Sequence, residues 1–264
     1  MIVTFVHHSC FVVETSERVL IFDYFQNGRI KGYHFTGVLP EFDRKKPLYV
    51  FASHFHQDHF DMEILKWAQE YPRIHYILSK DIHLSARFLE KNGISPSIKE
   101  KITFVRHGKN YEVDDMKIKT LRSTDAGVAF LIYMESKYIY HAGDLNLWKW
   151  EGAGDLVNGK ESRAYKHEIN KLSDYAIDVA FVPLDSRQQK HAAAGLFYFM
   201  ERVNAKIVFP MHMWQDYSYI GAFKSQISNG SFARRLVDVS GENESYALSG
   251  NPLSLSAIVR GKIE

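Results

Sequence analysis

Several features are scarce in this chain of 264 residues, and each scarcity excludes a class of protein. The single cysteine, Cys10, allows no disulfide within the chain, which excludes a disulfide-stapled secreted framework. No apolar run approaches the roughly 20 residues that cross a bilayer, so no membrane association is expected. Lys and Arg number 33 against 31 Asp and Glu, so the charge excess typical of nucleic-acid or acidic-lipid binding is missing.

The residues that are present are typical of a globular protein. Hydrophobic residues make up 45% of the chain and charged residues 24%. Cys10 lies in an apolar stretch, so we expect a buried side chain rather than a reactive thiol. Residues 1–8 lack the basic segment and cleavage site of a signal peptide. We therefore expect a cytoplasmic protein with a single domain over residues 1–264, whose oligomeric state the sequence does not indicate.

Short β-branched and aromatic runs predict more strands than a simple alternation of strands and helices would give. The expected strands are 2–6, 10–14, 18–23, 47–52, 74–78, 101–105, 116–121, 128–134, 138–141, 177–182 and 206–209. The expected helices are 61–70, 81–91, 162–172, 192–203 and 217–227. Residues 152–159, which are rich in glycine, are expected to form a mobile loop. This pattern favours an α/β (α+β) fold with two face-to-face sheets and outer helices, a four-layer αββα sandwich.

The strongest chemical signal is the segment Ser53-His54-Phe55-His56-Gln57-Asp58-His59, which directly follows an apolar run. Alternate residues of a strand share a face, so His54 and His56 can point the same way, with Phe55 turned toward the core. The following turn can bring Asp58 and His59 toward the same point. Imidazole and carboxylate groups together suit zinc, iron or manganese. The alternative is a chance histidine-rich turn, in which the crowded titratable groups would gain little from one another.

The pattern His-x-His-x-Asp-His at a strand end resembles the signature of the metallo-β-lactamase superfamily, and the resemblance continues along nearly the whole chain. Asp23 closes an apolar strand and resembles the family's early aspartate, which supports the metal ligands from behind. Asp144 follows Tyr140-His141-Ala142-Gly143 and resembles the aspartate that bridges two metals. His212 follows Phe209-Pro210-Met211 and resembles the last ligand histidine. The resemblance implies the αββα sandwich with the site at one edge.

These three residues also have simpler interpretations. Asp23 could be a turn residue, Asp144 a helix N-cap, and His212 a buried core histidine. The family role is favoured for Asp23 because the preceding strand is fully apolar. It is favoured for Asp144 because Ala142-Gly143 lets the backbone approach closely, and the ligand role is also favoured for His212.

The chain departs from the family pattern between the histidine cluster and Asp144, where another ligand histidine is usual. Residues 121–130 contain no histidine, and Asp125 stands at the expected place before a strand. A carboxylate oxygen binds the same metals at nearly the same distance as an imidazole nitrogen. We therefore predict that Asp125 replaces the histidine, the alternative being a turn cap before Gly127. An extra carboxylate would shift the metal preference toward manganese or iron.

The resemblance implies two divalent metal ions, with zinc expected and manganese or iron as alternatives. The implied ligands are His54, His56 and Asp125 at the first ion, Asp58, His59 and His212 at the second, and Asp144 as the bridge. A water between such ions ionises near neutral pH, and the hydroxide can attack a carbonyl carbon or a phosphorus. Asp58 is the candidate for passing a proton to the leaving group.

Other residues are candidates for the substrate wall. His8 lies between the first two strands, in a loop that borders the site in this family unless it is a surface turn. Arg187 could hold an anion, although a solvated loop capped by Asp185 is equally consistent with the sequence. Three tryptophans follow motif residues, and packing is favoured over a role in a substrate pocket: Trp148, Trp150 and Trp214.

We expect hydrolysis of a small-molecule ester, lactone, thioester or phosphodiester. Cleavage of RNA or DNA is an alternative, which the absence of a long basic stretch disfavours. Iron redox chemistry is a further alternative, and so is a noncatalytic metal-binding relative. The complete pair Asp58-His59 argues against the noncatalytic relative. Membership of a superfamily does not fix the substrate.

Overall fold

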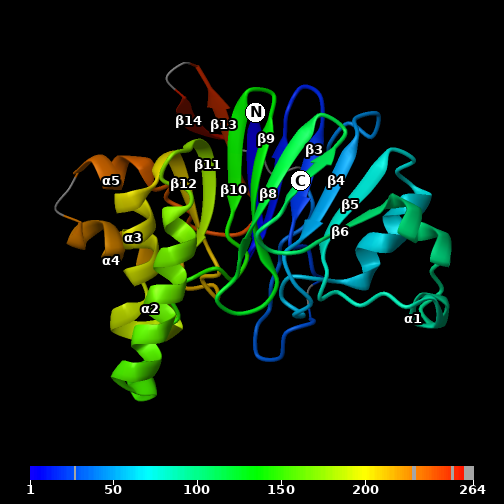
Figure 1. The fold of residues 1–264 in the computed structure, drawn as a ribbon. Helices are drawn as coiled ribbons and strands as arrows, with labels where there is room; N and C mark the ends of the chain where they lie inside the picture. The colour runs from blue at the N-terminus through cyan, green and yellow to red at the C-terminus, as the bar shows by residue number, and fades with distance from the viewer. Residues whose placement is uncertain (27, 228–229, 251–252, 259–264) are drawn as a thin grey trace. The chain divides into compact units, whose positions relative to one another are not determined.

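The computed structural model of the protein describes residues 1–26, 28–227, 230–250 and 253–258. The chain divides into two compact units, and each described part is built on one mixed β-sheet with helical segments (Figure 1). Unit 1 comprises Met1–Val105 and Gly241–Glu264, and unit 2 comprises Arg106–Ser240. Across the described residues, no helix combines the length and the apolar character needed to cross a membrane.

The sheet of unit 1 has the strand order β14-β13-β1-β2-β3-β4-β5-β6. Its strands are β1 (Ile2–His7), β2 (Cys10–Glu14), β3 (Val19–Phe22), β4 (Leu48–Ala52), β5 (Ile74–Ser79), β6 (Ile102–Val105), β13 (Glu244–Ser249) and β14 (Ser254–Ile258). Its helical segments are the 3₁₀ segments η1 (Met62–Gln69) and η2 (Pro96–Lys101) and the helix α1 (Ala86–Lys91). Strands β3 to β6 are parallel, so their carboxyl ends share one edge of the sheet. Asp23 follows β3 at this edge, and the histidine cluster follows β4.

The sheet of unit 2 has the strand order β12-β11-β10-β9-β8-β7. Its strands are β7 (Asn110–Val113), β8 (Met116–Arg122), β9 (Val128–Met134), β10 (Lys137–His141), β11 (Ala176–Pro183) and β12 (Asn204–Met211). Its helical segments are η3 (Glu151–Ala153), α2 (Gly154–Asn170), η4 (Ser186–His191), α3 (Ala194–Arg202), α4 (Ser218–Gln226) and α5 (Gly230–Arg235). Helix α3 packs against β11 and β12, and α2 packs against α3.

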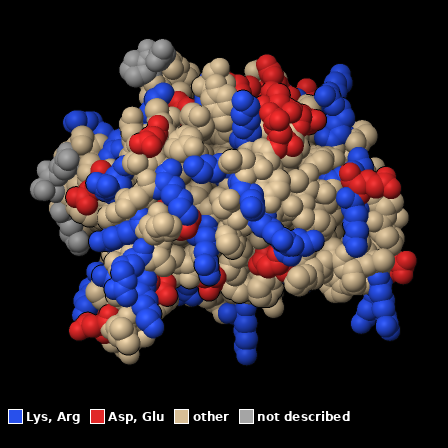
Figure 2. Space-filling view, viewed as in Figure 1, with Lys and Arg blue, Asp and Glu red and all other residues tan. Residues whose placement is uncertain are grey.

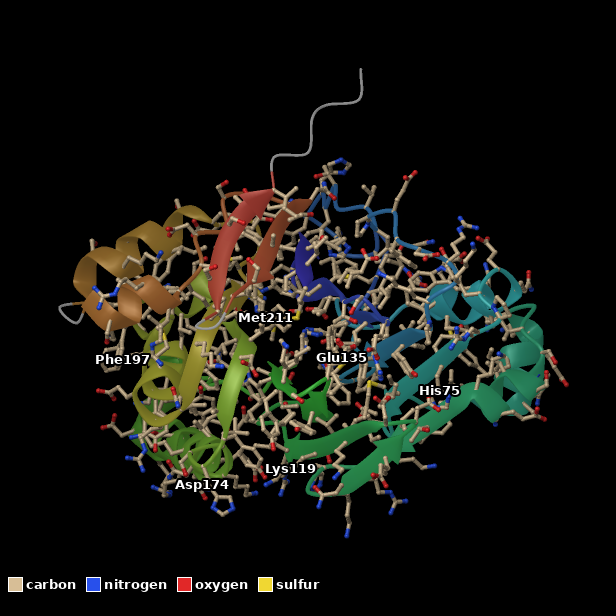
Figure 3. The ribbon with its side chains drawn as sticks, turned by 90° about the horizontal axis from the view of Figure 1, so that it is seen from above. His75, Lys119, Glu135, Asp174, Phe197 and Met211 are labelled. Atoms are coloured by element: carbon tan, nitrogen blue, oxygen red, sulfur yellow. The ribbon has the colours of Figure 1, made fainter. Side chains whose placement is uncertain are left out.

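Strands β10, β11 and β12 are parallel, so their carboxyl ends also lie at one edge. Asp144 follows β10, Asp185 follows β11 and His212 follows β12 at that edge. The carboxyl-terminal halves of these strands are buried and mostly apolar: Met211, for example, is fully buried. In the view from above, Met211 lies inside unit 2, whereas Lys119 and Asp174 lie at its outer border (Figure 3).

All eleven predicted strands are confirmed to within two residues at each end, and the predicted burial of Cys10 is also confirmed. The helix predictions are less accurate. The segment predicted as a helix over 61–70 is a 3₁₀ segment, although Asp61 caps it as expected by accepting from Glu63 N–H. The helix predicted over 81–91 begins only at Ala86, because the Ser85 hydroxyl accepts from Phe88 N–H and sets the start there.

The mobile loop predicted over 152–159 is wrong. Residues 151–153 form η3, and α2 already begins at Gly154. The low helix propensity of glycine is outweighed because α2 buries Tyr165 and Ile169, and such packing supplies most of a helix's stability. The predicted inward orientation of Phe55 is also wrong, since this side chain is 55% exposed beyond the end of β4.

Candidate metal centre

The histidine cluster forms a tight turn after β4, a strand buried at every position. His59 N–H and Phe60 N–H both donate to the His56 carbonyl oxygen, at 3.0 and 2.9 Å, which folds the chain back on itself. His54 Nε2 lies 2.9 Å from His56 Nδ1, and the ring centroids of His54 and His59 are 4.1 Å apart. The turn therefore gathers three imidazoles within unit 1, as the sequence predicts.

Asp23 supports this cluster from behind. Its carboxylate lies 2.7 Å from His59 Nδ1 and accepts hydrogen bonds from Ser53 N–H and Ser53 Oγ, each at 2.7 Å. A carboxylate on one ring nitrogen of a histidine fixes the ring and leaves the other nitrogen to serve as a ligand. Asp23 has the left-handed φ of 45°, a conformation that costs a non-glycine residue energy and clusters at functional sites.

His8 belongs to the same group. Its buried ring brings Nε2 to 3.3 Å from Asp58 Oδ2, and His59 Nε2 lies 3.7 Å from that same oxygen. His8, Asp58 and His59 each offer a ligand atom within 4.8 Å of the others. The sequence suggests His8 only as a neighbour of the substrate, whereas its position against two predicted ligands makes it a candidate ligand as well.

The carboxyl edge of unit 2 gathers a second set of donors. Asp144 and Asp125 offer carboxylate oxygens within 4.8 Å of one another. His212 Nε2 lies 3.4 Å from Asp144 Oδ1. Gly143 has a φ of 50° and His212 a φ of 60°, so the backbone bends sharply at both strand ends. The three unit 2 residues predicted as ligands are therefore close together.

Asp185 is a site residue that the sequence interpretation missed. His212 Nδ1 lies 3.1 Å from Asp185 Oδ2, and this carboxylate is fully buried. Arg187 donates to Asp185 through Nε and Nη2. Burial works to raise the pKa of Asp185, but the hydrogen bonds and charges of His212 and Arg187 outweigh it and lower the pKa to about 2. The position of Asp185 after a buried strand, as with Asp23, is the signal that could have identified it.

Arg187 is exposed to solvent, but contacts within unit 2 hold its side chain. Besides its contact with Asp185, its guanidinium lies 4.1 Å from the centre of the Trp214 ring. Trp214 and Trp148 both contact His212, with ring centroids 5.5 and 5.6 Å away. Trp148 Nε1 also donates to the Asp144 carbonyl oxygen at 3.0 Å. The tryptophans therefore pack around the predicted ligands of unit 2.

The donors of each unit fit a divalent cation. Unit 1 supplies imidazole nitrogens with one carboxylate, and unit 2 supplies two carboxylates with one imidazole. These are the groups that zinc, manganese and iron bind. Two of the imidazoles, those of His59 and His212, are each backed by a buried carboxylate. This is the usual arrangement behind metal-ligating histidines in proteins.

Comparison with known proteins agrees with this chemistry. The beta-lactamase superfamily domain matches residues 2–212. A UPF0173 metal-dependent hydrolase of Desulforamulus reducens is 29% identical over 197 residues, which cover 70% of this chain and 72% of that protein.

Solved structures share the fold. Igni18, a metallo hydrolase from Ignicoccus hospitalis, superposes with a TM-score of 0.61 at 18% identity, covering 94% of this chain and 99% of that one. YhfI of Bacillus subtilis, a metallo-beta-lactamase fold protein, gives a TM-score of 0.52 at 13% identity, covering 93% and 99%. The predicted fold class is thereby confirmed. The chain belongs to the metallo-β-lactamase superfamily.

Proposed function

We propose that this protein is a metal-dependent hydrolase that works with two divalent metal ions, zinc in the first instance, and cleaves an ester, lactone, thioester or phosphodiester bond of a small molecule. The proposed ligands are His54, His56 and Asp125 for one ion, Asp58, His59 and His212 for the other, and Asp144 as the bridge. His8 is a further candidate ligand beside Asp58. When bound, such a metal pair supplies an ionised water near neutral pH and stabilises the oxyanion of the reaction.

Among the side chains of the protein, Asp58 is the one to which we assign the proton transfer. The supporting observation is that Asp58 Oδ2 lies within reach of two imidazoles, 3.3 Å from His8 Nε2 and 3.7 Å from His59 Nε2. A carboxylate held in this way can orient a nucleophile and then hand a proton from Oδ2 to the leaving group. Asp58 is also partly exposed, so substrate can approach it.

The supporting residues keep this geometry fixed. Asp23 holds His59 by Nδ1 in unit 1, and Asp185 holds His212 by Nδ1 in unit 2. Because the carboxylate occupies Nδ1 in both histidines, Nε2 is the nitrogen left to bind a metal ion. Rigid support of this kind matters because small displacements of catalytic groups cost large factors in rate.

Elemental analysis of the purified protein, paired with a substrate screen, tests the proposal. We expect two metal ions per chain, with turnover of at least one of the ester, lactone, thioester or phosphodiester probes. Asp58→Asn should lose about 10²–10⁴-fold in turnover while it retains at least one metal ion. Asp43→Asn is the matched control, because Asp43 only accepts from Lys45 N–H in an exposed turn.

Other outcomes would redirect or reject the proposal. A chain that binds no metal, or an Asp58→Asn variant with full turnover, would contradict it. Turnover of phosphodiesters alone, including RNA or DNA, would favour the nuclease alternative over small-molecule hydrolysis. Iron as the only metal, together with oxygen consumption, would favour redox chemistry instead.

A further inference from the structure

One face of the unit 2 sheet carries two rows of side chains that cross four strands. The strand registers pair Glu112 with Lys117, Lys117 with Tyr133, and Tyr133 with Tyr138. Directly opposed residues of neighbouring strands lie on the same face of a sheet. The second row, built from the same registers, is Asn110, Lys119, Leu131 and Tyr140.

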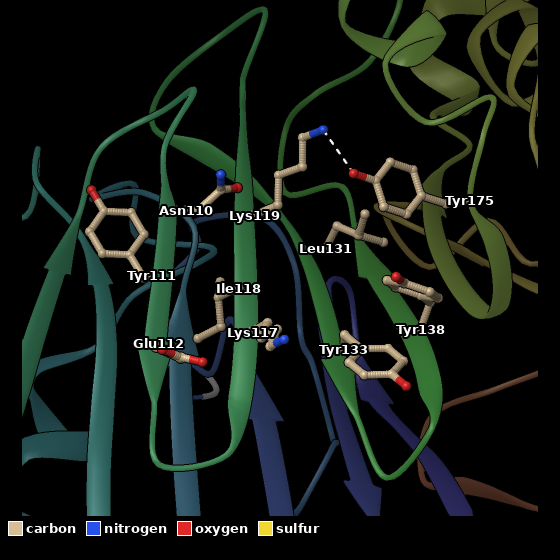
Figure 4. A pocket seen from close by; sticks show the side chains of 10 residues that line it. All are labelled: Asn110, Tyr111, Glu112, Lys117, Ile118, Lys119, Leu131, Tyr133, Tyr138 and Tyr175. Carbon is tan, nitrogen blue, oxygen red and sulfur yellow. Dashed lines mark hydrogen bonds between the residues drawn. The ribbon is translucent and has the colours of Figure 1, made fainter.

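Helices cover only part of this face. Tyr140, at the end of the second row, is fully buried and stacks on Phe199 of α3, with centroids 5.4 Å apart. By contrast, Tyr133 and Tyr138 are half-buried, and Lys117 is exposed. Between them lies a pocket of about 670 Å³ that is open to solvent (Figure 4). Its size falls in the range of small-molecule sites.

Three tyrosines form a continuous aromatic wall in this pocket. The ring centroids of Tyr133 and Tyr138 are 4.8 Å apart, and those of Tyr138 and Tyr175 are 5.3 Å apart. Lys119 rises from β8 toward Tyr175, donating from Nζ to the Tyr175 hydroxyl at 3.0 Å (Figure 4). The ammonium also lies 4.9 Å from the centre of that ring. An ammonium has three donors, so Lys119 can also bind an anion.

We propose that this pocket binds a small planar aromatic molecule that carries an anionic group. The ring would stack on Tyr133 and Tyr138, and Lys119 would bind the anion, with Lys117 adding positive charge. Among the described residues that line the pocket, the one acidic side chain, Glu112, stands on the edge strand β7, at the end of its row. The lining therefore places two ammonium groups and one carboxylate beside an aromatic surface, which favours an aromatic ring that carries an anionic group.

The pocket suits a small ligand better than a nucleic-acid strand. Strand binding requires a continuous basic track beside the stacking side chains. On the face that Figure 2 shows, Lys and Arg side chains are interspersed with acidic and neutral residues.

The pocket is also distinct from the candidate metal ligands of unit 2. Tyr138 lies near the start of β10, whereas Asp144 follows its end. From Tyr138 to His141 the strand alone spans roughly 10 Å, at about 3.3 Å per residue. Binding at this pocket can therefore be separated from binding at the metal site by mutation.

Isothermal titration calorimetry with phenylphosphonate tests the proposal, because this probe has both a ring and an anion joined by a bond that hydrolysis does not cleave. Methylphosphonate, which lacks the ring, and benzyl alcohol, which lacks the charge, are the control probes. We expect saturable binding of phenylphosphonate that Lys119→Met and Tyr138→Ala each weaken about tenfold. Lys160→Met, at an exposed position on α2, should retain the wild-type affinity.

Three results would overturn the proposal. Methylphosphonate binding as tightly as phenylphosphonate would assign the binding to an anion site alone. Equal phenylphosphonate affinity in wild type, Lys119→Met and Tyr138→Ala would place the probe elsewhere, for example at the metal ligands. A change in sedimentation of Tyr138→Ala without a change in probe affinity would identify the face as a contact between copies of the chain. Circular dichroism of each variant checks that it is folded.

Discussion

Asp185 Oδ2 lies 3.1 Å from His212 Nδ1, and Arg187 donates hydrogen bonds to both oxygens of the same carboxylate. The pair reproduces in unit 2 the relationship between Asp23 and His59 in unit 1, where the distance is 2.7 Å. In each unit a buried carboxylate at the carboxyl end of a strand sets the orientation of a histidine from a neighbouring strand end. The same carboxylate–histidine arrangement therefore occurs in two separate segments of the sequence.

We expect Asp185→Asn to lower metal affinity by about 10- to 100-fold while the protein stays folded, because the amide supports the His212 ring less well than the carboxylate does. Competition with a chromogenic chelator measures the affinity. Asp178→Asn is the matched control, since Asp178 lies on the preceding strand β11 and binds Lys206 at 2.6 Å. Equal affinities in both variants and wild type would show that Asp185 does not position the ligand.

Asp125→Ala should reduce the metal content by one ion per chain, because it removes the carboxylate proposed to replace the usual histidine. Asp125→His should retain two ions and shift the preference toward zinc, since an imidazole is a softer ligand than a carboxylate. Mass spectrometry of metals in dialysed protein measures both effects. The control for the loss of a negative charge is Asp155→Ala, which removes an exposed carboxylate on α2. Unchanged stoichiometry in Asp125→Ala would reject the ligand role.

Asp61 makes the stability of the protein depend on pH at the acid end. Burial tends to raise its pKa, but hydrogen bonds from Arg29 and from Glu63 and Gln26 N–H outweigh it, so the folded pKa lies below the usual value. The carboxylate therefore stabilises the fold fully above the unfolded pKa, near 4, and loses this effect as the pH falls through the folded pKa.

We expect Asp61→Asn to unfold more easily than wild type at pH 7, by about 1–2 kcal/mol, and the difference to be smaller at pH 2. Urea denaturation at the two pH values measures the difference. A constant difference between wild type and variant at both pH values would mean that the charge of Asp61 is not the stabilising feature.

Gly195 should not tolerate a side chain. A Cβ at this position in α3 would lie 2.1 Å from Asn146 Oδ1 and 3.1 Å from Leu147 N. Asn146 donates to Gln188 at 2.9 Å and would have to move. We expect Gly195→Ala to destabilise the protein by about 1–3 kcal/mol in urea denaturation.

The control for Gly195→Ala is Gly221→Ala in α4, where a Cβ would meet no atom within 4 Å. This variant should be as stable as wild type or more stable, by up to about 1 kcal/mol, because alanine favours a helix. If the two alanine variants were equally stable, the close approach between α3 and the segment after Asp144 would not be real.

Eleven strands were predictable because their apolar runs are short, β-branched and bounded by polar turns, whereas β7, β13 and β14 were not among the predicted ranges. The fold class rested mainly on the resemblance to the metallo-β-lactamase superfamily, since the strand pattern alone supported it only weakly. Helix starts were harder to predict. Ser85 and Gly154 set two of them, and neither stands out among the other polar and small residues nearby. Phe55 was placed inward because strand alternation was extended past Ala52, where the strand already ends.

The candidate ligands were predictable because their residue types and spacings are rare. The residues that hold these ligands in place were harder to predict from the sequence. Asp185 looks like a helix cap in the sequence, and it is one, accepting from Arg187 N–H at 3.0 Å. Its second contact, with His212, depends on β11 and β12 lying side by side, which no local pattern reveals. The pocket of Tyr133, Tyr138 and Tyr175 likewise arises from strand register and not from any contiguous motif.

His8, Asp23 and His212 all have a backbone conformation that glycine adopts without cost and other residues adopt with strain. Glycine would relieve that strain at each position, but it would also remove the imidazole or carboxylate. Selection for stability therefore favours glycine at these three positions, whereas selection for activity favours the residues that are present. A descendant of this protein that had lost its activity would be free to accumulate glycine at all of them.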